Sequence, residues 1–138
     1  MKVIDILNNT DKPVFSFELV PPLKGGDINK IYEAIEPLIA LAPPFINITF
    51  HRDEVVYREY PDGTIKKVTV TKRPGSVALA AAIMRRYNVD MVPHIVCGGA
   101  TRHKIENELI DLNFLDIENV MALRGDPIPG ERFFTPEE

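Results

Sequence analysis

The sequence predicts an α/β fold with a parallel sheet, of the kind that forms the first half of a (β/α)8 barrel. Short apolar strands alternate with helical patterns, and with one hairpin set aside their order is β-α-β-α-β-α-β. A doubly wound sheet begins with the same alternation, but the strands here also have one face that turns polar toward their carboxyl ends, which favours the barrel. A complete barrel needs about 250 residues. The 138 residues of this chain therefore correspond to about half of one.

The first part of the chain is expected to contain a helix or arm, a strand and a longer helix. Residues 1–13 form the helix or arm, and residues 14–20 form the strand. Asp27 is the expected N-cap of the longer helix, because its side chain can accept a hydrogen bond from a free backbone amide. Pro37 lies inside this helix and should kink it. The apolar residues of the helix recur at helical spacing: Ile28, Ile31, Ile35 and Leu38.

The middle of the chain predicts a second strand, a hairpin and a second long helix. Residues 45–50 form the strand, and residues 54–72 alternate like a hairpin around a turn at residues 61–63. Proline at the first position of a helix is favoured, so that the alanine-rich helix is expected over residues 74–87. The hairpin is an insertion in the otherwise regular alternation of strands and helices.

The last part of the chain predicts a third strand, a helix and a fourth strand. The strands cover residues 91–97 and 118–124, and Thr101 caps a helix that reaches to about residue 113. Side chains alternate between the two faces of a strand. On each strand, one face is therefore expected to carry the polar residues. These are Ser16 and Glu18 on the first strand, Asn47 and Thr49 on the second, His94 with Val92 and Val96 on the third, and Arg124 and Asp126 with Ala122 on the fourth. In a barrel these ends converge where the active site lies.

Composition excludes several classes of function. The net charge of −4 and the isoelectric point near 5.4 argue against a nucleic-acid-binding surface. No apolar run approaches the ~20 residues of a membrane span. The single cysteine, Cys97, cannot form an internal disulfide, and with no secretion signal a cytoplasmic location is expected.

Glu18 is the first candidate for chemistry. A carboxylate on the inner face of a barrel is costly unless it is paired or protonated. Burial would favour its protonated form and suit it to general acid catalysis. The alternative is a structural ion pair with a buried cation, for which Arg124 is the candidate partner.

The histidines and the cysteine do not predict a metal site. His94 can be a ligand-binding residue or a hydrogen-bonded core histidine, whereas His51 and His103 are expected at the surface. No two histidines have the spacing of metal ligands, and Cys97 has no cysteine partner.

Four segments together resemble the methylenetetrahydrofolate reductase family, over about residues 13–130. They are Phe15-Ser16-Phe17-Glu18 with Pro21-Pro22, Phe45-Ile46-Asn47-Ile48-Thr49, Pro93-His94-Ile95 and Ala122-Leu123-Arg124-Gly125-Asp126. The resemblance implies a (β/α)8 barrel with FAD across the carboxyl ends of the strands. It implies a ping-pong cycle in which NADH or NADPH reduces FAD and leaves. 5,10-Methylenetetrahydrofolate then binds in place of the nicotinamide and becomes 5-methyltetrahydrofolate.

The resemblance also assigns roles to individual residues. Glu18 matches the general acid that assists opening of the methylene-bridged ring, and Asp126 matches a carboxylate near the flavin that also holds the pterin. Both would therefore be catalytic and bind the folate. The positions that match flavin contacts are Thr49, Phe50, His94, Leu123, Arg124, Gly125 and Asp126. Phe50 departs from the family pattern, since many relatives carry tyrosine there.

We therefore expect residues 1–138 to be the N-terminal half of a barrel domain, with residues 54–72 as an inserted hairpin and no second domain. Such a chain is expected to bind FAD weakly alone, to have little reductase activity, and to self-associate through its exposed edges. The alternatives are another barrel enzyme with Glu18 as general acid or base, and a non-catalytic fragment that self-associates.

Overall fold

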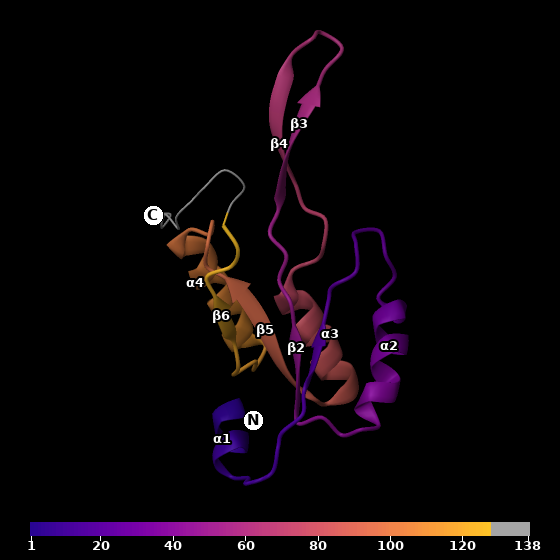
Figure 1. Cartoon of the computed structure of the whole chain (residues 1–138), viewed down its shortest axis with the longest axis vertical. Coiled ribbons are helices and arrows are strands. Elements are labelled where there is room, and N and C mark those ends of the chain that lie inside the picture. The colour runs from indigo at the N-terminus through magenta and orange to yellow at the C-terminus, as the bar shows by residue number, and fades with distance from the viewer. Residues whose placement is uncertain (128–138) are drawn as a thin grey trace.

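A parallel sheet organises the computed structural model, which describes residues 1–127 (Figure 1). The elements in chain order are α1 (Val3–Asn8), β1 (Phe17–Leu19), α2 (Asn29–Ile39), β2 (Phe45–Ile48), β3 (Glu54–Glu59), β4 (Ile65–Val70), α3 (Ser76–Tyr87), β5 (Asp90–Val96), α4 (Arg102–Phe114) and β6 (Met121–Leu123). The α/β class and the predicted order of strands and helices are confirmed.

The four strands of this sheet pair in the order in which they occur along the chain, β1-β2-β5-β6, and every pair is parallel. A doubly wound sheet reverses its strand order at a switch point. No such reversal occurs among the strands of residues 1–127. Consecutive strands are therefore neighbours, each joined to the next through a helix.

One face of the sheet carries the apolar core. Ile46, Met91 and Ile95 of the strands pack with apolar residues from α2, α3 and α4. The helix residues in this core are Ile35, Leu79, Ala80, Ile83 and Leu112, and each is at most 6% exposed. The opposite face carries Glu18, Asn47, Val92 and His94. Glu18 pairs with Asn47, and Asn47 pairs with Val92. His94 lies two residues after Val92 in β5 and therefore shares its face. The three helices therefore leave the polar face free for chemistry.

The two edge strands are shorter than predicted. β1 has three residues where residues 14–20 were expected, and β6 has three where residues 118–124 were expected. An edge strand has a neighbour on one side only, so that its ends lack the second row of hydrogen bonds that extends a central strand. Phe15 and Leu123 are accordingly 77% and 37% exposed.

Thr101 is the N-cap of α4, as the sequence predicts, whereas the N-cap of α2 is Ile28, and the predicted cap Asp27 lies one residue before it. Asp27 Oδ1 accepts a hydrogen bond from the backbone amide of Asn29 at 2.9 Å. Hydrogen bonds from the Asn29 amide and then from its side chain hold the pKa of Asp27 below its usual value. Thr101 Oγ1 accepts from the backbone amide of Lys104 at 3.2 Å. Pro37 lies inside α2, near its carboxyl end.

The predicted hairpin is present as β3 and β4, an antiparallel pair that extends away from the sheet at the end opposite α1 (Figure 1). At its turn, the Thr64 side chain and backbone amide both donate to Asp62, which lowers the pKa of that carboxyl. At its base, Lys72 Nζ lies 2.5 Å from Glu54 Oε2. A backbone hydrogen bond from Lys24 to Lys72 then ties the base to the loop that follows β1.

Candidate active site at the carboxyl ends of the strands

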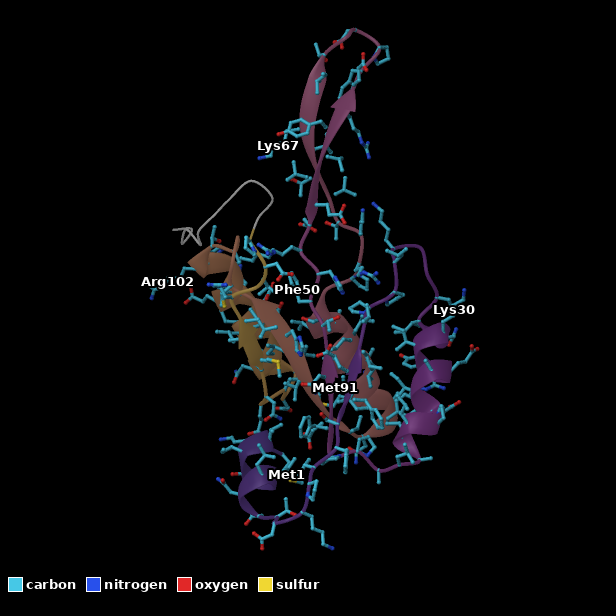
Figure 2. The ribbon with its side chains drawn as sticks, viewed as in Figure 1. Met1, Lys30, Phe50, Lys67, Met91 and Arg102 are labelled. Atoms are coloured by element: carbon cyan, nitrogen blue, oxygen red, sulfur yellow. The ribbon has the colours of Figure 1, made fainter. Side chains whose placement is uncertain are left out.

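Hydrogen bonds continue past the ends of the strands and hold the following residues side by side. The Thr49 amide donates to the Leu19 carbonyl at 2.9 Å, and the Cys97 amide donates to the Leu123 carbonyl at 2.7 Å. The Gly98 amide donates to the Arg124 carbonyl at 2.9 Å. The segments after β1, β2, β5 and β6 therefore form one continuous edge, below the hairpin, where Phe50 lies in Figure 2.

Glu18 and His94 come together on the polar face of the sheet. Glu18 Oε2 of β1 lies 3.7 Å from His94 Nε2 of β5, and β2 separates the two strands in the sheet. His94 is buried, and its Nε2 has no hydrogen-bond partner among the described residues. A protonated His94 would form an ion pair with the Glu18 carboxylate across this distance.

The structure corrects two expectations for Glu18. Its side chain is 57% exposed instead of buried, since β1 is an edge strand and the described residues do not cover this part of the polar face. The ionisable group within 4 Å of its carboxylate in residues 1–127 is His94, whereas no ion pair with Arg124 is formed there. Solvent therefore reaches the carboxylate directly.

Asn47 is a site residue for which the sequence predicted a face but no function. It lies on β2 at the register position of Glu18, and it is 8% exposed. Its Nδ2 donates to Ser16 Oγ at 3.2 Å, while its Oδ1 has no partner among the described residues. A buried polar atom without a hydrogen bond is costly. Asn47 Oδ1 and His94 Nε2 are thus two buried atoms that a polar ligand can satisfy.

The two residues after β2 have distinct surroundings. Thr49 Oγ1 lies 3.3 Å from the Leu19 carbonyl oxygen, to which it donates, and 3.3 Å from His51 Nε2. Lys104 Nζ lies 5.6 Å from the centre of the half-buried Phe50 ring, within cation–π range. Thr49 therefore belongs to the edge between β1 and β2, and Phe50 turns its ring toward the start of α4.

The loop after β6 requires glycine at its centre. Gly125 has a φ of +81°, and a Cβ added there would lie 2.4 Å from Val96 Cγ1, which is an overlap. The flanking side chains of Arg124 and Asp126 are exposed. The backbone conformation and the close contact both exclude a larger residue at Gly125.

The predicted face of Ala122 is wrong. Ala122 pairs with Ile95 on the helix side, whereas Leu123 pairs with Val96 on the face that carries His94. The register of the pairing, which the sequence pattern does not contain, decides this. The left-handed conformation of Gly125 then ends the alternation, so that strand periodicity does not determine the directions of Arg124 and Asp126.

Arg52 is a residue of this edge that sequence reasoning missed. Its Nη1 donates to the Gly98 carbonyl at 3.2 Å, and its Nη2 donates to the Asp126 carbonyl. The signal in the sequence that could have indicated Arg52 is its position shortly after a predicted strand. Of the remaining candidates, His51 and His103 are exposed, and no group of three or more possible metal ligands occurs in residues 1–127.

Comparison with known proteins assigns the chain to a family. A sequence model described as methylenetetrahydrofolate reductase matches residues 2–138. The chain belongs to the methylenetetrahydrofolate reductase family. The resemblance predicted from the four sequence segments is thereby confirmed.

Individual family members are distant and longer. Methylenetetrahydrofolate reductase (NADH) 1 of Arabidopsis thaliana is 26% identical over 141 residues, which cover 100% of this chain and 21% of the relative. The probable methylenetetrahydrofolate reductase (NADH) of Oryza sativa is 27% identical over 97% of this chain and 20% of the relative. The 5,10-methylenetetrahydrofolate reductase of Salmonella typhimurium is 25% identical over 83% of this chain and 33% of the relative. The chain thus spans about a fifth to a third of these relatives.

Within residues 1–127, the helices are too short or too polar to cross a membrane.

Gly125→Ala is expected to destabilise the protein more than Gly63→Ala. Both glycines have a similar positive φ, but the added Cβ meets Val96 only at Gly125 and meets nothing within 4 Å at Gly63. The shared backbone strain costs roughly 1–2 kcal/mol. The overlap at Gly125 should add about 1–3 kcal/mol. Chemical denaturation of both variants measures the difference, and equal losses would contradict the close contact.

Proposed function

We propose that this protein is a flavin-dependent reductase that converts 5,10-methylenetetrahydrofolate to 5-methyltetrahydrofolate, with NADH as the reductant. The observation that carries the proposal is the Glu18–His94 contact of 3.7 Å on the polar face of the sheet. The family match over residues 2–138 supports the folate as substrate. The names of the Arabidopsis and rice relatives specify NADH, which supports this reductant over NADPH.

The fold part of the proposal is that β1, β2, β5 and β6 are the first four strands of a (β/α)8 barrel. Sequential order, parallel pairing and helices on one face support it. In such barrels the active site lies at the carboxyl ends of the strands. Residues 1–138 would then be the N-terminal half of one barrel domain, with the β3–β4 hairpin inserted after its second strand.

The residues of the candidate site fit FAD. Two buried polar atoms have no hydrogen-bond partner within residues 1–127: Asn47 Oδ1, which can accept a hydrogen bond, and His94 Nε2, which can accept or donate one. Arg124 provides an exposed cation, which suits an anionic group. The residues that would hold FAD are Thr49, Phe50, His94, Leu123, Arg124, Gly125 and Asp126. Bound FAD supplies a two-electron carrier between NADH and the folate.

Glu18 acts in this proposal as the general acid. Opening of the methylene-bridged ring requires a proton on a ring nitrogen, and the exposed Glu18 carboxyl is accessible to a substrate. Once the proton has left, a protonated His94 at 3.7 Å would stabilise the remaining carboxylate. Asp126, also exposed, would accept hydrogen bonds from the pterin.

The proposal separates into two half-reactions that Glu18→Gln should affect differently. The wild-type chain is expected to bind FAD weakly, so that FAD is supplied in excess; NADH should then bleach the visible flavin absorbance, and methylenetetrahydrofolate should restore it. Glu18→Gln should slow the restoration about 10²–10⁴-fold, the range expected when a general acid is lost. Bleaching by NADH should change far less, because that step needs no proton from Glu18.

Glu59→Gln is the matched control, because Glu59 is an exposed glutamate of the hairpin strand β3. Stopped-flow absorbance measures both steps in all three proteins. Wild-type protein that binds no FAD, or an unchanged folate step in Glu18→Gln, would contradict the proposal.

We also propose that the protein self-associates. β1 and β6 each have one free edge in the described sheet, and the outer side of α4 exposes Leu109, Ile110 and Phe114 by 47%, 48% and 84%. Free strand edges and contiguous apolar side chains favour contacts between chains. Light scattering should therefore give a mass that rises with concentration, and a constant monomer mass would contradict it.

A further inference from the structure

Arg52 ties together the segments that follow three strands. It comes shortly after β2, its Nη1 donates to the carbonyl of Gly98 after β5, and its Nη2 donates to the carbonyl of Asp126 after β6. We infer that Arg52 is a positioning residue that fixes the Arg124–Gly125–Asp126 loop for binding of FAD and folate. This inference rests on the proposed function.

Gly98 links the two hydrogen bonds of Arg52 into one network. Its carbonyl accepts from Arg52 at 3.2 Å, while its amide donates to the Arg124 carbonyl at 2.9 Å. Arg52 therefore acts on the loop twice: directly at Asp126, and through the Gly98 backbone at Arg124. Gly98 is buried, so that these bonds exchange with water less readily than bonds at the surface.

The loop has few other restraints. β6 is only three residues long, and its strand pairing ends at Leu123. Within residues 1–127, the bond from Arg52 is the hydrogen bond that holds the Asp126 backbone. Gly125 cannot supply rigidity of its own, since glycine has the largest conformational freedom of any residue. The position of Asp126 therefore depends on Arg52.

The Arg52 guanidinium also packs against the Gly125 backbone. A Cβ on Gly125 would lie 3.4 Å from Arg52 Nη2, so that the guanidinium rests against the glycine backbone. Arginine presents two donors in a planar fork, which reaches two carbonyl oxygens at once. Lysine has the same charge but a single ammonium group on a flexible stem. Lysine at position 52 therefore keeps the charge and loses the fork.

The test compares Arg52→Met and Arg52→Lys with wild-type protein, and uses Arg58→Met of the hairpin strand β3 as a control for the loss of an arginine. Fluorescence titration measures the affinity for FAD, and hydrogen exchange measures protection of the backbone amides of residues 98 and 122–126. Both Arg52 variants should bind FAD about tenfold more weakly, the effect of losing one charge-assisted hydrogen bond. Both should also exchange faster at residue 98 and across the loop, while Arg58→Met matches wild type.

Steady-state kinetics at saturating FAD provide a readout that general destabilisation does not produce. The KM for methylenetetrahydrofolate should rise more than the KM for NADH, because displacement of Asp126 affects the pterin. Unchanged FAD affinity and unchanged exchange in Arg52→Met would overturn the inference. Wild-type behaviour of Arg52→Lys would also overturn it, since charge would then suffice. If wild-type protein binds no FAD, the proposed function fails, and the exchange data still decide whether Arg52 fixes the loop.

Discussion

The parallel hydrogen-bonded ladder from β1 to β6 is the constraint on which the rest of the structure depends. Because every strand runs in the same direction, the residues that follow the strands meet at one edge of the sheet. The apolar core fixes the register, since a slip by one residue would turn Ile46, Met91 and Ile95 away from the helices. The same register places Glu18 and His94 on the opposite face, within 3.7 Å of each other.

Local features were predictable from the sequence, and features that depend on pairing or coverage were not. Thr101 caps its helix as expected, because a cap involves residues two or three positions apart, and the predicted cap Asp27 lies one residue before the N-cap of its helix. The face of Ala122 depends on its pairing with Ile95, and the exposure of Glu18 depends on what covers an edge strand. Arg52 reaches two carbonyls that lie far away in the sequence, which no local pattern indicates.

The candidate site divides into two parts with different physical origins. Glu18, Asn47 and His94 are side chains on a rigid sheet, and their positions follow from the strand register. The loop of residues 124–126 lies beyond its strand and takes its shape from a left-handed glycine and from hydrogen bonds to neighbouring segments. Under the proposed function, the site thus combines a general acid on the sheet, Glu18, with a loop at residues 124–126 whose shape needs separate support.

The most direct test of this account is the response of His94 and His103 to FAD, measured by imidazole NMR. His94 is buried on the polar face, and its Nε2 has no hydrogen-bond partner within residues 1–127, whereas His103 lies on the exposed surface of α4. The account predicts that FAD shifts the His94 ring resonances strongly and leaves those of His103 unchanged. Unchanged His94 resonances in protein that is saturated with FAD would contradict the assignment of the flavin site to this edge of the sheet.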